Sequence, residues 1–393
     1  MVCRIRCGSH RASSTVRVLV LGNGASGAEK QALALGDKLR RHRLLKNTSV
    51  ARCLSMDCVR VTLGTARRVP PVLQVIGARV TRNPLWGYEV QERTRSLLAL
   101  HSDLRAFNVV IGCGRSTVAL CATMKQTAPT KTFNVQIQHP RVPFSWFDAV
   151  VVPRHDVPLA KGGATNLYRT SGTVHAVTRG LLQYHGRKWT AELEEKLCGR
   201  RMRVVWLVGG PCRGFAFTEQ EAEHMVDELG RALLRDDDEP AVLVTFSRRT
   251  PEYVKKVICR GLYARLPLPG QVLVWDGTER HNPYYALLAM ASCIVTTPDS
   301  ISMTTEAIAA GKPVFTIGVA ACKGKFLRFH EYMFKLKATA PFTADDVAAS
   351  LRRNVDDEDN ASSCARVMLE NETCEIVDTI ARGIDDAVQR SGA

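Results

Sequence analysis

The chain has 393 residues, of which 45% are hydrophobic and 23% charged, a composition typical of a globular protein with room for two domains. Its apolar stretches fall far short of the roughly 20 residues that a membrane-spanning helix needs, so no transmembrane segment is expected. Lys and Arg outnumber Asp and Glu by 54 to 38, and residues 1–100 alone hold 18 basic against 5 acidic residues. This imbalance indicates an anionic partner, such as a phosphate-bearing substrate or an acidic membrane surface; a merely solvated basic face is the alternative.

Residue types disfavour several other classes of partner. The basic stretches lack interleaved aromatic residues and recognition motifs, so no nucleic acid is expected. Thirteen cysteines without a C-x-x-C pair favour buried thiols in a reducing compartment, and neither a disulfide framework nor a metal site is expected.

Residues 1–14 are Arg-rich and free of acids, like a short mitochondrial presequence, although a strand predicted from Val16 leaves little room for cleavage.

Short apolar runs alternate with helical patterns in the first half of the chain. Residues 16–21 are continuously apolar, as expected of a strand buried on both faces. Glycines follow, and then a predicted helix over residues 27–41, with Ser26 and Glu29 at the positions of a capping box. The other strands predicted here are residues 72–76, 109–111, 133–137 and 149–152, and the other helices are residues 90–100 and 116–125.

A second series follows a polar stretch at residues 187–201. Thr218 with Glu221 predicts one helix start, and Thr250 with Pro251 predicts another. A last helix over residues 302–310 stops at Gly311. The strands predicted in this series are residues 203–208, 241–246, 272–275, 293–296 and 314–317.

This strand–helix alternation predicts an α/β fold of two Rossmann-like, doubly wound parallel-sheet domains that face a cleft. Ligands of such domains bind beyond the carboxyl ends of the strands. The C-terminal helices could fold back across the first domain. The predicted divisions are a basic extension (1–15), an N-terminal domain (16–186), a linker (187–201), a nucleotide-side domain (202–342) and C-terminal helices (343–393).

The first candidate binding loop is G-x-G-x-x-G, formed by Gly22, Gly24 and Gly27 between a strand and a helix. The helix start presents free N–H groups and a positive dipole to an anion. No acid lies between Asp37 and Asp57, where a dinucleotide fold needs one to hold the ribose, so NAD is not expected. A tight turn with close helix packing is the structural alternative.

The second candidate site combines two loops of the later series. Gly209 and Gly210 follow its first strand, and Arg248 and Arg249 follow its second strand. A diphosphate at this carboxyl edge could meet backbone N–H groups and a guanidinium. Two arginines at a helix start oppose the helix dipole, which favours an anion between them over a solvated face.

The most specific segment is residues 296–313, which is typical of a strand, a loop of small residues, a helix, Gly311 and Pro313. Ser300 and Ser302 suit phosphate oxygens, and the carboxylate of Glu306 could accept both hydroxyls of a ribose. In the alternative interpretation the serines only cap the helix and Glu306 is solvated. His139, His155 and Asp156 are the candidate acid–base residues, although an isolated histidine is more often structural than catalytic.

Two resemblances add to these patterns. The segment 302–313 resembles the E-x-x-x-x-G-x-P region of GT-B glycosyltransferases, which implies that Glu306 holds the ribose of a nucleotide sugar. Over about residues 16–342 the chain resembles the mitochondrial fission family named after the plant elongated-mitochondria protein. The matching segments are GNGASGAEKQALALGDKL, VVIGCGRS, VQIQHPRVPFSWFDAVVVPRHD, VVWLVGGPCRGFAFT, LVTFSRRTP, VWDGTERHNPYYALLAMASCIVTTPDSISMTTEAIAAGKPV and KFLRFH.

The second resemblance implies a GT-B-like fold and, for the plant member, a peripheral role at the outer mitochondrial surface, where it helps a dynamin-related GTPase in division. We expect this protein at the outer mitochondrial surface or in the cytoplasm, and we expect no cofactor. Bacterial relatives are labelled as nucleoside-diphosphate-sugar enzymes, so a nucleotide-sugar-dependent glycosyltransferase is the alternative function. One departure weakens that alternative. Ala28 follows the first glycine loop, where the peptidoglycan glycosyltransferase carries a histidine, and an inverting transfer needs a base.

Overall fold

The computed structural model describes residues 16–24, 26–45, 54–61, 69–90, 107–127, 132–157, 164–234, 239–276, 282–352 and 360–392. The chain forms two compact units. Unit 1 comprises Met1–Val152, Ala160–Arg169 and Cys374–Ala393, and unit 2 comprises Pro153–Leu159 and Thr170–Thr373. Each unit is built on its own sheet, as the alternating pattern of the sequence predicts.

Unit 1 is built on a doubly wound sheet with the strand order β2-β1-β3-β4-β5-β6. The strands are β1 (Val16–Gly22), β2 (Leu54–Arg60), β3 (Val109–Cys113), β4 (Phe133–Ile137), β5 (Ala149–Pro153) and β6 (Leu167–Thr170). All pairs from β2 to β5 are parallel. The order reverses between β1 and β3, so the loops after these two strands meet at the point where such sheets bind ligands.

Two predictions in unit 1 need correction. Residues 72–76 form no strand but part of helix α2 (Pro71–Thr81), which buries Gln74, Val75 and Ala78. A short apolar run cannot by itself distinguish a strand from a helix, and the buried residues here follow the helical period. The strand that the prediction missed is β2, which pairs with β1. Its sequence, LSMDCVR, is too polar to predict a buried strand.

The described part of unit 1 also contains the helices α1 (Ser26–Leu45) and α4 (Val118–Thr127), as predicted to within a few residues. The predicted helix over residues 90–100 lies outside the described residues except at its first position, and so does the side chain of the capping residue Ser26. The end of the chain returns to unit 1 through α12 (Asn360–Gly392), as expected for C-terminal helices. There Gly383 contacts Phe133, whose Cε2 would lie 2.7 Å from a Cβ at this glycine.

Unit 2 has the strand order β12-β11-β10-β7-β8-β9, which reverses between β7 and β10. Its strands are β7 (Arg203–Val208), β8 (Ala241–Phe246), β9 (Val272–Trp275), β10 (Cys293–Thr296), β11 (Val314–Thr316) and β12 (Ala340–Pro341). The first five match the predicted strands, and every pair is parallel.

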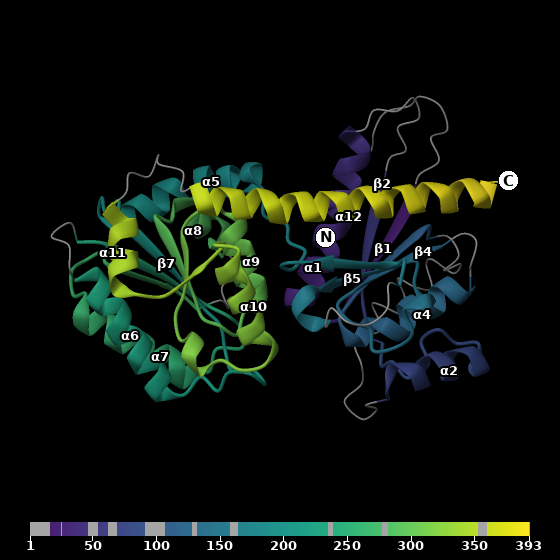
Figure 1. Ribbon diagram of the computed structural model, residues 1–393, viewed down its shortest axis with the longest axis horizontal. Helices are drawn as coiled ribbons and strands as arrows, with labels where there is room; N and C mark the ends of the chain where they lie inside the picture. Colours follow the sequence, from purple (N-terminus) through teal and green to yellow (C-terminus); the bar gives the residue numbers. More distant parts are fainter. Residues whose placement is uncertain are drawn as a thin grey trace. The chain divides into compact units, whose positions relative to one another are not determined.

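Alternating residues of β7 build the two layers that cover this sheet. Val204, Trp206 and Val208 face one core, and Val205 and Leu207 face the other. The first core lies under α6 (Glu219–Leu233), α7 (Glu252–Arg265) and α11 (Ala344–Arg352), and the second lies under α5 (Arg179–Leu197), α8 (Tyr284–Met290), α9 (Ile301–Ala309), α10 (Lys325–Lys335) and the start of α12 (Figure 1).

The prediction of a linker over residues 187–201 is wrong, because helix α5 continues to Leu197. Its polar residues are solvated, while Trp189, Leu193 and Leu197 recur every four residues and are buried in unit 2. The predicted boundary at residue 186 therefore falls inside a helix. Among the described residues, no helix combines the length and the apolar character that crossing a bilayer requires.

Candidate functional site

The neighbouring strands β7 and β10 of unit 2 bring two predicted binding loops together at their carboxyl ends. Gly209 and Gly210 follow β7, and the loop 297–300 follows β10. The N–H of Gly209 donates to Thr297 Oγ1 at 2.8 Å, and the N–H of Gly210 donates to Asp299 Oδ2 at 2.9 Å. The backbone N–H groups expected to meet a diphosphate are thus bound to the protein's own side chains.

Asp299 occupies the place where the sequence predicted an external anion. The residue is 3% exposed, and its Oδ1 accepts a hydrogen bond from the hydroxyl of Thr297 at 2.7 Å. Burial raises the pKa of this carboxyl, while the bonds from Gly210 and Thr297 and the charge of Arg249 act in the opposite direction. A Cβ at Gly209 would overlap the Asp299 carboxylate, so the glycine is needed to admit Asp299.

Arg249, and not Arg248, reaches this loop. Arg249 Nη2 donates to Asp299 Oδ2 at 2.9 Å, whereas the exposed Arg248 has no hydrogen bond or ion pair with any described residue. The prediction that Thr250 caps α7 is wrong, because the N-cap is Pro251. The hydroxyl of Thr250 donates to the carbonyl of Gly209 instead, which fastens the start of α7 to the glycine loop.

The segment 296–313 contributes a cap and a buried carboxylate. Ser300 is the N-cap of α9, with its Oγ accepting from the N–H of Met303 at 3.4 Å, and Ser302 is half-buried in the first turn. Glu306 is only 5% exposed, and its Oε2 accepts from the hydroxyl of Tyr284 at 2.6 Å. This environment differs from both predicted ones, open to a ribose or solvated, because Tyr284 already donates to one carboxylate oxygen and would compete with ribose hydroxyls for it.

The candidate acid–base residues belong to different units. Asp156 lies in unit 2, where its Oδ1 accepts from Lys325 Nζ at 3.0 Å. The neighbouring His155 packs edge-on against Phe329, and burial lowers its pKa. His139 follows β4 in unit 1, and its Nδ1 accepts from the N–H of Arg141 at 3.0 Å. Each candidate base is thus already in contact with neighbours of its own unit.

His330 belongs to the site, although it was not among the site residues predicted from the sequence motifs. It is fully buried, its Nε2 bonds the carbonyl of Pro298 at 2.9 Å, and its Nδ1 lies 3.4 Å from Thr316 Oγ1. Burial lowers its pKa to about 4, so the neutral ring braces the loop that carries Asp299. The only signal in the sequence was its place in the KFLRFH segment.

The glycine loop of unit 1 is open by comparison. Gly24 has a φ of +75°, which favours glycine, and no described atom lies within 4 Å of a Cβ placed at Gly24 or Gly27. Close packing against the described part of the chain therefore does not account for Gly27. Gly114 follows the neighbouring strand β3, and a Cβ placed at this glycine would lie 3.4 Å from Asn23 Nδ2. The loops that follow β1 and β3, where the strand order reverses, therefore lie next to each other.

Solved structures support the fold class. A glycosyltransferase from Rickettsia africae is 11% identical with a TM-score of 0.50, and the match covers 94% of this chain and 99% of that one. A UDP-glucosyltransferase from Polygonum tinctorium is also 11% identical with a TM-score of 0.50, over 95% of this chain and 100% of the other. Together with the two doubly wound parallel sheets of this protein, these likenesses identify its fold as GT-B-like.

Sequence relatives narrow the identity further. The Arabidopsis thaliana "Mitochondrial fission protein ELM1" is 29% identical over 262 residues, which cover 62% of this chain and 59% of the plant protein. An uncharacterized protein of Rickettsia prowazekii is 28% identical over 247 residues, covering 56% of this chain and 67% of that protein. The family model described as mitochondrial fission ELM1 matches residues 26–371. The chain therefore belongs to the mitochondrial fission ELM1 family.

Proposed function

We propose that this protein acts peripherally at the mitochondrial surface during division, as a recruitment factor on a GT-B-like scaffold, with a dynamin-related GTPase as its partner. Family membership supports the role in division. The observation that carries the peripheral attachment is an exposed apolar surface on helix α2, in the basic part of the chain.

This surface, which we call the α2 face, consists of Val72, Leu73, Ile76 and Val80. Their side chains are 38%, 51%, 48% and 79% exposed. The spacing puts them on one side of the helix, while Gln74, Val75 and Ala78 are buried on the other side, which packs toward α4. Contiguous apolar side chains of this kind on a globular surface mark a contact with a membrane or another protein.

The basic character of this part of the sequence favours an anionic membrane. The exposed Arg82 ends the helix, and residues 1–100 carry 18 basic against 5 acidic residues. Helices that lie in the membrane interface combine an apolar face with flanking basic residues in this way. Each Lys or Arg near an anionic bilayer contributes about 1 kcal/mol to binding.

The loops of unit 2 are consistent with a scaffold that does not turn over a donor. Asp299 already binds the N–H of Gly210, and Tyr284 already binds Glu306. A nucleotide sugar would have to compete with both contacts, which a protein that only recruits a partner never needs to do.

Vesicle co-sedimentation tests the attachment. We expect the wild type to bind vesicles of anionic phospholipid, and the double variant Ile76→Glu, Val80→Glu to bind about tenfold less, because each charge blocks burial of an apolar side chain. Leu234→Glu, at a 61% exposed leucine of unit 2, is the matched control and should bind like the wild type. Equal binding of the double variant would refute the role of the α2 face; no binding by the wild type would refute the membrane attachment itself.

A nucleotide-sugar-dependent glycosyltransferase is the second candidate. Two observations favour it: no described atom lies close to a Cβ placed at Gly24 or Gly27, and the guanidinium of Arg248, just after β8, pairs with no described residue. In this function Glu306 holds the ribose, Gly209, Gly210 and Arg248 lie near the diphosphate, and His139 or Asp156 acts as the base.

Calorimetry with UDP-glucose and UDP-N-acetylglucosamine tests this candidate. If Glu306 holds a ribose, Tyr284→Phe is expected to strengthen binding several-fold because it releases the carboxylate, whereas Glu306→Ala abolishes binding. Absence of binding heat for both the wild type and Tyr284→Phe would remove the glycosyltransferase from consideration.

A further inference from the structure

Unit 2 contains a cavity of about 180 Å³ that none of the loops above uses. It lies between the start of α5, the last residues of α9 and the first half of α12. Apolar side chains, including Leu182 and Val367, line part of its wall. Its polar lining consists of His175, Thr178, Arg179, Arg366 and Glu370.

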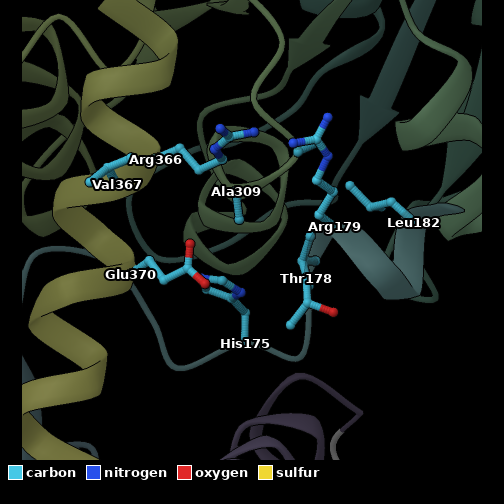
Figure 2. A pocket seen from close by; sticks show the side chains of 10 residues that line it. His175, Thr178, Arg179, Leu182, Ala309, Arg366, Val367 and Glu370 are labelled. Atoms are coloured by element: carbon cyan, nitrogen blue, oxygen red, sulfur yellow. The ribbon is translucent and has the colours of Figure 1, made fainter.

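Two arginines from different helices line this cavity together with one carboxylate, that of Glu370. Figure 2 shows Arg366 of α12 and Arg179 of α5 extending from opposite sides into the space above Ala309, while the carboxylate of Glu370 lies on the side of His175. Neither arginine forms a hydrogen bond or ion pair with a described residue, and neither does Glu370. Arg179 and Glu370 are exposed and Arg366 is half-buried, and the two guanidiniums outweigh the single carboxylate, so the lining has a positive balance that attracts an anion.

The side chain of Arg366 packs against Gly311. This glycine has a φ of +73°, and a Cβ there would lie 2.7 Å from Arg366 Nη1 and 3.3 Å from Arg366 Cδ. The stem of Arg366 thus packs on the backbone that ends α9. A pre-positioned guanidinium loses less side-chain freedom on binding than one in solvent.

Charge and size together select the ligand. Two guanidiniums match the roughly −1.5 to −2 charge of a phosphate monoester at neutral pH, and their forked N–H groups suit its oxygens. The carboxylate of Glu370 accepts hydrogen bonds only, so it calls for a hydroxyl or ammonium group on the same molecule. The volume lies below the roughly 300–1,000 Å³ of pockets for drug-sized ligands, which favours a molecule of few atoms.

We propose that this cavity binds a small, water-soluble phosphate monoester that carries a hydroxyl or amino group, with the phosphate on Arg179 and Arg366 and the donor group on Glu370. The cavity shares no lining residue with the carboxyl-edge loops or with the α2 face. This proposal is therefore tested independently of the proposed function.

Thermal unfolding and calorimetry of the full chain with glycerol 3-phosphate and phosphoethanolamine test the proposal. We expect both esters to raise the unfolding temperature relative to sodium chloride of equal ionic strength, because a ligand that binds only the folded state stabilises it. The double variant Arg179→Ala, Arg366→Ala should bind at least about tenfold more weakly, since two charge-assisted contacts are lost. Arg260→Ala, at an exposed arginine of α7 outside the cavity, is the matched control and should bind like the wild type.

Glu370→Gln separates the two ends of the site. It should weaken phosphoethanolamine more than inorganic phosphate, because only the former carries an ammonium group for the carboxylate. A shift that persists in the double arginine variant would overturn the proposal. So would binding to vesicles of phosphatidic acid in the absence of any response to the soluble esters, since the ligand would then be a lipid headgroup.

Discussion

Replacing Asp299 by Ala is expected to lower the free energy of unfolding by about 2–4 kcal/mol, because it leaves buried donors without an acceptor. The N–H of Gly210 and the hydroxyl of Thr297 both donate to this carboxylate. The loss of the contact with Arg249 adds little, because that guanidinium is half-exposed and solvated. Chemical denaturation of the two proteins at neutral pH measures the difference.

Asp276→Ala is the matched control for this prediction. Asp276 also follows a strand of unit 2 and pairs with Lys255, but its side chain is 48% exposed. Removing such a surface pair changes stability by at most about 1 kcal/mol. If Asp299→Ala cost no more than Asp276→Ala, the carboxylate would not be what holds the glycine loop.

The strands of unit 2 were predictable because their signals are local. A strand buried on both faces reads as an uninterrupted apolar run, as residues 203–208 do, whatever the rest of the fold. The same holds for Thr218, whose side chain accepts from the N–H of Glu221 as the capping pattern predicts. Such features depend on neighbours three or four residues away.

The errors arose where burial is decided by distant parts of the chain. Residues 72–76 are as apolar as a strand, and only the packing of Gln74, Val75 and Ala78 shows the helical period. In α5, the polar residues between Trp189, Leu193 and Leu197 hid an apolar stripe four residues apart. Local propensity was informative in both cases, but it did not identify the surface against which the segment packs.

The candidate site shows the same limit more sharply. Gly209, Gly210 and Glu306 were identified from their motifs, but the side chains that bind them were not. Gly210 and Asp299 are 89 residues apart in the chain, and Tyr284 precedes Glu306 by 22 residues from another helix. No spacing rule predicts such pairs, because they follow from strand order and from the rotation of each helix.

Stability is expected to fall as the pH decreases from about 6.5 toward 4, with His330 as a main cause. Burial lowers the pKa of His330 to about 4, whereas in the unfolded chain the imidazole titrates near 6.5. Between these values the unfolded state binds a proton that the folded state does not, so acid favours unfolding. From about pH 7 to about pH 5 this histidine alone should cost about 2 kcal/mol. Burial of His155 acts in the same direction.

Denaturation of the wild type and His330→Gln at both pH values tests this. The variant cannot take up the proton, so we expect it to be less stable at about pH 7, where two hydrogen bonds are altered, but to have a clearly shallower pH dependence. His224→Gln, at an exposed histidine of α6, should leave the pH dependence of the wild type unchanged. Identical slopes for the wild type and His330→Gln would show that His330 is not the group that titrates. Because Nε2 donates to the carbonyl of Pro298, the proton is taken up at Nδ1, which faces Thr316 Oγ1, so the hydroxyl of Thr316 must then change from donor to acceptor while the bond to Pro298 is kept.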